Sequence, residues 1–182
     1  MEIPHSERLH YRLMTLADKA LMHEVDQDED VMKFINGGNK SSMEDIENVM
    51  LPRLNAYINP EEGWGLWAVF HTNTRQYLGW ILVRPMHFFS DTPAFDDLEL
   101  GWRFKKSAWG YGYATEAAAH IMKYLSCSPN VTTFSAIAVK ENVASINIMS
   151  KLGMEYVKTA VHHDPLGDML LEYYSVQIED EG

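Results

Sequence analysis

The sequence predicts an α/β fold, and three observations support that prediction. The chain has 182 residues and 46% of them are apolar, which is enough to bury a core and too many for a disordered chain. Segments in which apolar residues alternate with polar ones are interleaved with segments of helical period. No repeat, low-complexity tract or linker divides the chain, so we expect a single domain over residues 1–182.

The N-terminal part is predicted to begin with a strand and a helix. Apolar and polar residues alternate over residues 7–14, as in a half-buried strand. Residues 18–35 then follow a helical period, and residues 36–38, Asn-Gly-Gly, suit a helix C-cap and a turn. We therefore expect one helix ahead of this turn.

A second helix is predicted to begin at Ser41 or Ser42. Each of these serines is followed three positions later by an acidic residue, which is the spacing of a capping box. Pro52 should kink or shorten the helix, because proline removes a backbone donor and clashes with the preceding turn.

An antiparallel hairpin is predicted next. Aromatic and β-branched residues fill two runs, 65–72 and 76–85, with only residues 73–75 between them. The loop that follows, 85–96, is long enough to be functional, although packing of its aromatic rings is the simpler interpretation. These rings belong to Phe88, Phe89 and Phe95.

The segment 97–104 has the clearest strand pattern in the chain. Its apolar residues Leu98, Leu100, Trp102 and Phe104 share one face, and Glu99, Gly101 and Arg103 share the other. The remaining patterns predict a helix over 114–125, a strand over 131–139, a helix over 142–152 and strands over 155–161 and 169–176.

Composition excludes several classes of partner. Lys and Arg number 15 and Asp and Glu 26, so the formal charge of -11 opposes binding to nucleic acid. No apolar stretch approaches the roughly 20 residues that cross a bilayer, and the N-terminus lacks the features of a secretory signal. We therefore expect no membrane partner and a cytoplasmic location. Cys127, the single cysteine, is interpreted as a helix-end residue rather than a nucleophile.

The segment between the strand at 97–104 and the next helix carries the main functional signal. Gly110 and Gly112 lack the Cβ atoms that would keep an anion away from the backbone. The amides of residues 110–114 can then point into one concavity, to which the helix N-terminus adds partial positive charge. The expected ligand is a phosphate or pyrophosphate. The dinucleotide fingerprint fails, because Thr115 stands where its third glycine belongs, and the Walker pattern is absent.

Two segments taken together, WGYGYATEA at 109–117 and ENVASINIMSKLGM at 141–154, resemble the GNAT acetyltransferase family. The chain is most similar to the RimJ/RimL-like branch, which modifies protein N-termini and small amines. The resemblance covers nearly the whole chain. It implies a mixed, mostly antiparallel sheet that is splayed at its centre and flanked by helices on both faces.

The resemblance also implies acetyl-CoA as cosubstrate and no metal. The pantetheine arm would pair with a strand edge where the strands at 98–104 and 131–139 diverge. Ser107 stands where the family usually has Gln or Arg, which removes one side-chain donor. Asn142 would contact the CoA arm, cap the helix, or do both. The implied cofactor-binding residues are Trp102, Arg103, Phe104, Ser107, Gly110, Tyr111, Gly112, Tyr113, Ala114, Thr115, Asn142 and Ser145.

The expected reaction is direct attack of a primary amine, from a protein N-terminus or a small molecule, on the thioester. Glu99 is the candidate base, acting directly or through water, and the alternative is that it pairs with Arg103 on the same strand face. Many relatives carry a tyrosine as acid where this chain has Met149. Ser145 is then the candidate acid, with Tyr156 or a water as alternatives.

Other interpretations stay open at this stage. The alternatives to an active acetyltransferase are a catalytically silent CoA-binding module, suggested by the missing tyrosine and by Ser107, and a nucleotide-binding domain that uses the same glycine loop. The cluster at 162–168 has histidines and aspartates, but neighbouring strand residues face opposite ways, which disfavours a metal.

An acidic run in the N-terminal part is either a solvated helix face or a surface that steers a cationic acceptor. The exposed aromatic residues would allow a homodimer. The run comprises Glu24, Asp26, Asp28, Glu29 and Asp30.

Overall fold

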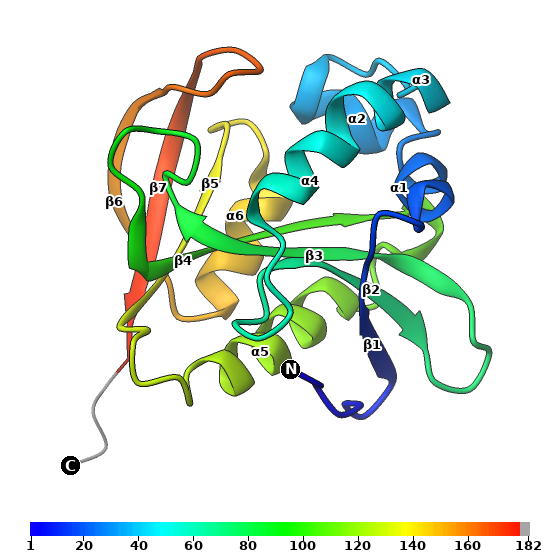
Figure 1. Cartoon of the computed structure of the whole chain (residues 1–182), viewed down its shortest axis with the longest axis horizontal. Helices are drawn as coiled ribbons and strands as arrows, with labels where there is room; N and C mark the ends of the chain where they lie inside the picture. The colour runs from blue at the N-terminus through cyan, green and yellow to red at the C-terminus, as the bar shows by residue number, and fades with distance from the viewer. Residues whose placement is uncertain (179–182) are drawn as a thin grey trace.

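A seven-stranded mixed sheet forms the centre of the protein (Figure 1). The computed structural model describes residues 1–178, so the last four residues of the expected domain lie outside the described part. The strand order is β1-β2-β3-β4-β5-β7-β6, and every neighbouring pair is antiparallel except β4 and β5. The strands are β1 (Leu9–Leu13), β2 (Gly65–His71), β3 (Tyr77–Met86), β4 (Ala94–Phe104), β5 (Thr133–Ala138), β6 (Glu155–His162) and β7 (Met169–Gln177).

Helices cover both faces of this sheet (Figure 1). The N-terminal group is α1 (Lys19–Val25), α2 (Glu29–Asn36), α3 (Met43–Asp45), a π-helical turn (Ile46–Met50) and α4 (Leu51–Tyr57), and the C-terminal group is α5 (Tyr113–Leu125) and α6 (Val143–Lys151). Each group packs on its own cluster of buried apolar side chains. Within residues 1–178 no helix is long and apolar enough to cross a bilayer. The α/β class is therefore confirmed, and the seven expected strands occur in the expected order, although the two helices expected before β2 are divided into shorter segments.

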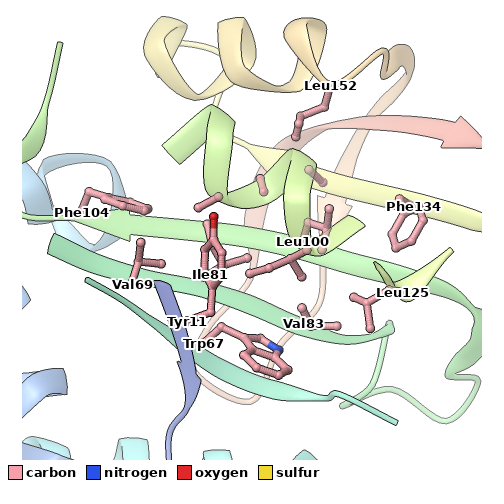
Figure 2. Close-up of a cluster of buried hydrophobic side chains, with 14 of the residues drawn as sticks. Tyr11, Trp67, Val69, Ile81, Val83, Leu100, Phe104, Leu125, Phe134 and Leu152 are labelled. Carbon is pink, nitrogen blue, oxygen red and sulfur yellow. The ribbon is translucent and has the colours of Figure 1, made fainter. Parts of the chain in front are cut away.

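The core beneath α5 shows how the strand pattern is used. Leu98 and Leu100 of β4 are each 1% exposed and pack with Ile81 of β3 and Ile121 of α5. Figure 2 shows Trp67, Ile81 and Leu100 in this layer between sheet and helix. Because successive strand residues point to opposite faces, Glu99 and Arg103 project toward the N-terminal helices instead.

The single helix expected over 18–35 is wrong, because the chain breaks it at residues 26–28. Asp28 has extended backbone angles and its side chain accepts a hydrogen bond of 2.8 Å from the Asp30 amide, which starts α2 afresh. Asp26 turns inward and is only 1% exposed. The helical spacing of apolar residues alone does not reveal this break, because the partners of the buried Asp26 come from other parts of the chain.

The second helix begins after Ser42, with both hydrogen bonds of the capping box formed to Asp45. The other candidate, Ser41, instead donates a hydrogen bond of 2.6 Å to Asp26. Pro52 lies in the first turn of α4, directly after the π-helical turn. Proline has no N–H to donate to a carbonyl of the preceding turn, which agrees with the change to a π-helical hydrogen-bond pattern just before it.

The loop after β3 is shorter than expected, because β3 extends to Met86 and β4 begins at Ala94. Phe88 and Phe89 pack edge-to-face against Tyr57, with centroid distances of 5.9 and 6.2 Å. Their expected packing role is confirmed. Phe95 differs, since it is 56% exposed and only its stacking on Trp64 covers it.

Candidate active site

The sheet opens between its two parallel strands. β4 and β5 pair at only three positions, Asp97–Thr133, Leu98–Phe134 and Glu99–Ser135. β4 then continues to Phe104 along β3 without β5 beside it. The expected splay is therefore present, and it leaves one edge of β4 unpaired over residues 100–104.

A groove of ≈ 600 Å³ runs from this edge between α2, α5 and α6, and we call it the α2–α5 groove. Ten of the twelve expected cofactor-binding residues line it, and the exceptions are Ser107 and Tyr111. Ser107 is exposed on the short turn Lys106–Ala108, and the Tyr111 ring stacks outside on Tyr113 at 5.3 Å. The rim also contains residues that the sequence did not indicate, including Lys33, Phe34 and Lys151.

The floor of the groove is a run of main-chain donors. Gly110 and Gly112 have φ values of 82° and 77°, which favour glycine and turn the chain into α5. Within residues 1–178 the amides of residues 110–115 have no hydrogen-bond acceptor, and no side chain caps the helix. Six consecutive free donors at a helix N-terminus form a site for a phosphate or pyrophosphate.

The segment just before β1 holds this loop from outside the groove. The Arg8 guanidinium donates 2.8 Å to the Tyr111 carbonyl and 2.6 Å to Glu116 of α5. Ser6 Oγ and the Arg8 amide donate to the same carboxylate at 2.8 and 2.9 Å. Burial alone would raise the pKa of Glu116, but these hydrogen bonds outweigh it and lower the pKa, so the carboxylate stays charged.

Ser145 lies across the splay from β4. Its hydroxyl oxygen accepts a hydrogen bond of 2.9 Å from the indole nitrogen of Trp102, and its amide donates 3.2 Å to Asn142 Oδ1. An indole nitrogen can only donate, so the Ser145 proton remains free to donate elsewhere. Met149 is a core residue, only 1% exposed, whereas the Tyr156 hydroxyl bonds Thr159 outside the groove.

Glu99 does not pair with Arg103, so that alternative is wrong. The β3–β4 register places Arg84 opposite Glu99, and its Nε and Nη2 donate 2.8 and 3.4 Å to the two carboxylate oxygens. Both residues are less than 10% exposed. Arg103 instead donates 2.8 Å to Asp26, and its guanidinium lies over the Trp80 ring.

Three residues of the acidic run pair with cations at the end of β4 or just after it. Asp26 pairs with Arg103, Glu24 with Lys105 and Asp30 with Lys106. This pairing reduces the negative potential that the acidic run would otherwise create, so its attraction for a cationic acceptor is weaker than expected.

The histidine and aspartate cluster is divided among different partners. His162 Nδ1 lies 2.8 Å from the Tyr173 hydroxyl, and Asp164 pairs with Arg53. His163 and Asp168 pair at the surface. Burial lowers the pKa of His162, so this ring is neutral at pH 7. Within residues 1–178 no three His, Cys, Asp or Glu side chains form a group suited to a metal.

A splayed α/β sheet with free amides at the start of the following helix defines an acyltransferase of the acyl-CoA type, and the comparisons agree. A family model described as "Acetyltransferase (GNAT) domain" matches residues 8–155. The chain belongs to the GNAT acetyltransferase family. It is accordingly an enzyme that transfers acyl groups, and acetyl-CoA is its cosubstrate.

Three individual proteins show the range of similarity. The Bacillus subtilis (strain 168) protein YkkB, described as uncharacterized, is 31% identical over 157 residues, which cover 85% of this chain and 86% of YkkB. A GNAT-family acetyltransferase from Bacillus anthracis has a TM-score of 0.72 at 27% identity and covers 97% of this chain and 98% of its own. A complex of RimL, a ribosomal L7/L12 alpha-N-protein acetyltransferase, with coenzyme A has a TM-score of 0.73 at 13% identity, with 98% of both chains covered, and shows the fold alone.

Proposed function

We propose that this enzyme acetylates a primary amine by direct attack of the amine on the thioester of acetyl-CoA bound along the α2–α5 groove. The observation that carries this proposal is the run of six main-chain donors at residues 110–115, beside the unpaired edge of β4. Together these two features supply a diphosphate cradle and a strand edge for an extended arm.

The groove supports a specific placement of the cofactor. The amides of residues 110–115 would hold the pyrophosphate, and the edge of β4 at Trp102 and Arg103 would pair with the pantetheine arm. Lys33 and Lys151 line the groove and supply positive charge that Ser107 cannot. Asn142 caps α6 and lines the groove as well, so both of its expected roles are compatible with the geometry.

The acid and base roles follow from hydrogen-bond capacity. We propose that Glu99 accepts the proton of the amine. Because Arg84 already donates to both of its oxygens, a bridging water would carry the proton from the amine to Glu99. Ser145 would donate its free hydroxyl proton to the departing thiolate. An α-amino group, with a pKa near 8, is about one-tenth neutral at pH 7, whereas a lysine is neutral in less than about one molecule in a thousand. An α-amino acceptor therefore demands less of the enzyme's base than a lysine does.

The narrower assignments belong to the same proposal. The glycine motif and the Asn142 to Ser145 spacing support placement in the RimJ/RimL-like branch, whose acceptors are protein N-termini and small amines. The continuous sheet supports a single catalytic domain over residues 1–182, and the sequence supports a cytoplasmic location.

The first experiment measures cofactor binding and turnover separately. Acetyl-CoA should raise the melting temperature, and a panel of primary amines should release free thiol in its presence. CoA without the acetyl group should bind but give no turnover. Absence of any thermal shift with acetyl-CoA or CoA would overturn the proposal, and binding without turnover would favour a catalytically silent module.

Ser145→Ala tests the proposed acid. We expect kcat to fall about 100-fold while the affinity for CoA changes little, because the hydroxyl acts on the leaving group. Ser150→Ala is the matched control, since Ser150 is exposed on the same helix and does not line the groove. An unchanged kcat would assign the proton to water instead.

Glu99→Gln tests the proposed base through its pH dependence. At pH 7 we expect kcat/KM to fall about 100-fold. The loss should shrink as the pH rises above the pKa of the acceptor amine, because a neutral amine needs no base. An equal loss at every pH would mean that Glu99 only positions Arg84.

A further inference from the structure

A second cavity lies on the opposite side of the sheet from α5, beneath the N-terminal helices. We call it the inner pocket, and its volume is ≈ 190 Å³. It meets the α2–α5 groove at Arg103, which lines both. A cavity of about 150 Å³ suffices to hold benzene, so the inner pocket accepts one group of roughly phenyl size. Its apolar wall includes Met22, Ile46 and Leu82.

The polar lining of the inner pocket is dominated by hydrogen-bond donors. Arg53, Arg84 and Arg103 line it, and Asp26 is the one carboxylate among the lining residues. Both oxygens of Asp26 are occupied, Oδ1 by Arg103 at 2.8 Å and Oδ2 by Ser41 at 2.6 Å. A polar ligand that enters this space therefore meets cations and no free carboxylate.

Arg103 has an unused donor at this place. Its Nη1 serves Asp26, whereas within residues 1–178 neither its Nε nor its Nη2 has a hydrogen-bond partner, and of these two nitrogens only Nε is fully enclosed. A ligand in the pocket cannot reach the enclosed Nε, but an acceptor atom there would satisfy the free Nη2 donor.

The other two arginines add to the excess of hydrogen-bond donors over acceptors in the pocket lining. Arg53 and Arg84 bond Asp164 and Glu99, and neither of these carboxylates lines the pocket. Each guanidinium has five N–H donors and its partner uses only one or two of them. Burial raises the pKa of Tyr57 to about 12, so its hydroxyl is neutral and also able to donate.

On the basis of the proposed function, we infer that the acceptor is a small amine with a free carboxylate and an apolar body, as in an apolar α-amino acid. The carboxylate accepts from Arg103 Nη2, and the body packs on the apolar wall. A polyamine or an aminoglycoside brings further hydrogen-bond donors to a lining that already has an excess of donors. A protein N-terminus brings a neutral carbonyl in place of the carboxylate.

A matched acceptor series tests this inference. L-phenylalanine, phenylalaninamide, 2-phenylethylamine and spermidine are compared as acceptors, with L-methionine as a second amino acid, by thiol release from acetyl-CoA. We expect kcat/KM for phenylalanine to exceed that for the amide and for the decarboxylated amine by at least about tenfold. Preference for the amide would indicate a peptide N-terminus, and preference for 2-phenylethylamine or spermidine would remove the carboxylate requirement. Each of these outcomes overturns the inference.

Arg103→Lys connects the preference to its donor. Lysine retains a charge beside Asp26 but has no Nη2 to donate to the ligand, so the ratio of kcat/KM for phenylalanine to that for phenylalaninamide should fall to within about threefold. Arg12→Lys is the matched control, because Arg12 pairs with Asp18 at the surface and lines neither cavity. An unchanged ratio in Arg103→Lys would contradict the role given to Arg103.

Binding measurements separate this inference from the proposed function. If acetyl-CoA produces no thermal shift, the proposed function fails. If acetyl-CoA binds but millimolar phenylalanine or methionine neither reacts nor raises the melting temperature of the CoA-loaded protein, the inference fails while the cofactor site stands.

Discussion

The α2–α5 groove and the inner pocket meet at Arg103 but are built in different ways. The groove presents backbone amides of one continuous segment, residues 110–115. The inner pocket presents side chains of residues that lie far apart in the sequence, each tied to an acidic partner. Recognition by backbone amides suits a ligand that stays the same, such as the cofactor. Recognition by side chains can be altered by substitution, which suits an acceptor that differs from one enzyme to the next.

The first prediction concerns the ion pair behind the inner pocket. Arg84→Met leaves Glu99 buried without its partner and should lower the free energy of unfolding by about 3–5 kcal/mol. Replacing both residues, as Arg84→Met with Glu99→Leu, should recover most of that loss, because no unpaired charge remains buried. Urea unfolding measures both variants.

The exposed pair Arg12–Asp18 supplies the control for that prediction. Arg12→Met should cost no more than about 1 kcal/mol, because solvent screens the pair. Equal losses for Arg84→Met and Arg12→Met would show that water reaches Glu99, and the inner pocket would then resemble the open groove.

The second prediction concerns the backbone of the groove. Replacing both Gly110 and Gly112 with valine should weaken CoA binding about 100-fold or more, because at least two hydrogen bonds to a charged group are lost. Gly153→Val is the control, since Gly153 has nearly the same φ, 81°, but does not line the groove. It should lose stability and keep its CoA affinity. Calorimetric titration that finds the double variant unimpaired would disprove main-chain recognition.

The third prediction concerns Glu116, which holds the glycine loop through Arg8. Glu116→Gln should cost about 1–2 kcal/mol at pH 7, since hydrogen bonds to a charged acceptor are lost. The pKa of Glu116 is lower in the folded state than its ordinary value of 4.5, so the stabilisation is complete above that value and is lost as the pH falls through the lower folded pKa.

The stability difference between Glu116→Gln and the native protein should therefore stay constant down to about pH 5.5 and shrink in more acidic solution. Unfolding curves at several pH values measure it, with the exposed Glu61→Gln as control. A difference that grew on acidification would contradict the lowered pKa.

The sequence was informative where structure depends on local signals. Asn142 caps α6, Ser42 and Asp45 form the expected capping box, and β4 alternates as expected. These features depend on a few neighbouring residues, which the sequence displays directly. The same is true of the splay, which the family resemblance implied and the three-residue pairing of β4 and β5 confirms.

The sequence was less informative where partners come from distant segments. Nothing near Asp26 indicates that it leaves its helix to meet Arg103, and nothing near Lys33 indicates that α2 borders the groove. One signal was available for Arg84, because a charged residue within an otherwise apolar strand requires a buried partner. The identity of that partner, Glu99, depends on strand register, which residue pattern alone leaves undetermined.

The unpaired edge of β4 couples the folding of this enzyme to the metabolism around it. A ligand that binds only the folded state adds RT ln(1 + [L]/Kd) to its stability, which is about 2.7 kcal/mol at 100 times the Kd. If acetyl-CoA binds along β4 as proposed, that gain is comparable to the burial of about three methylenes. The lifetime of the folded chain would then rise and fall with the cellular supply of acetyl groups.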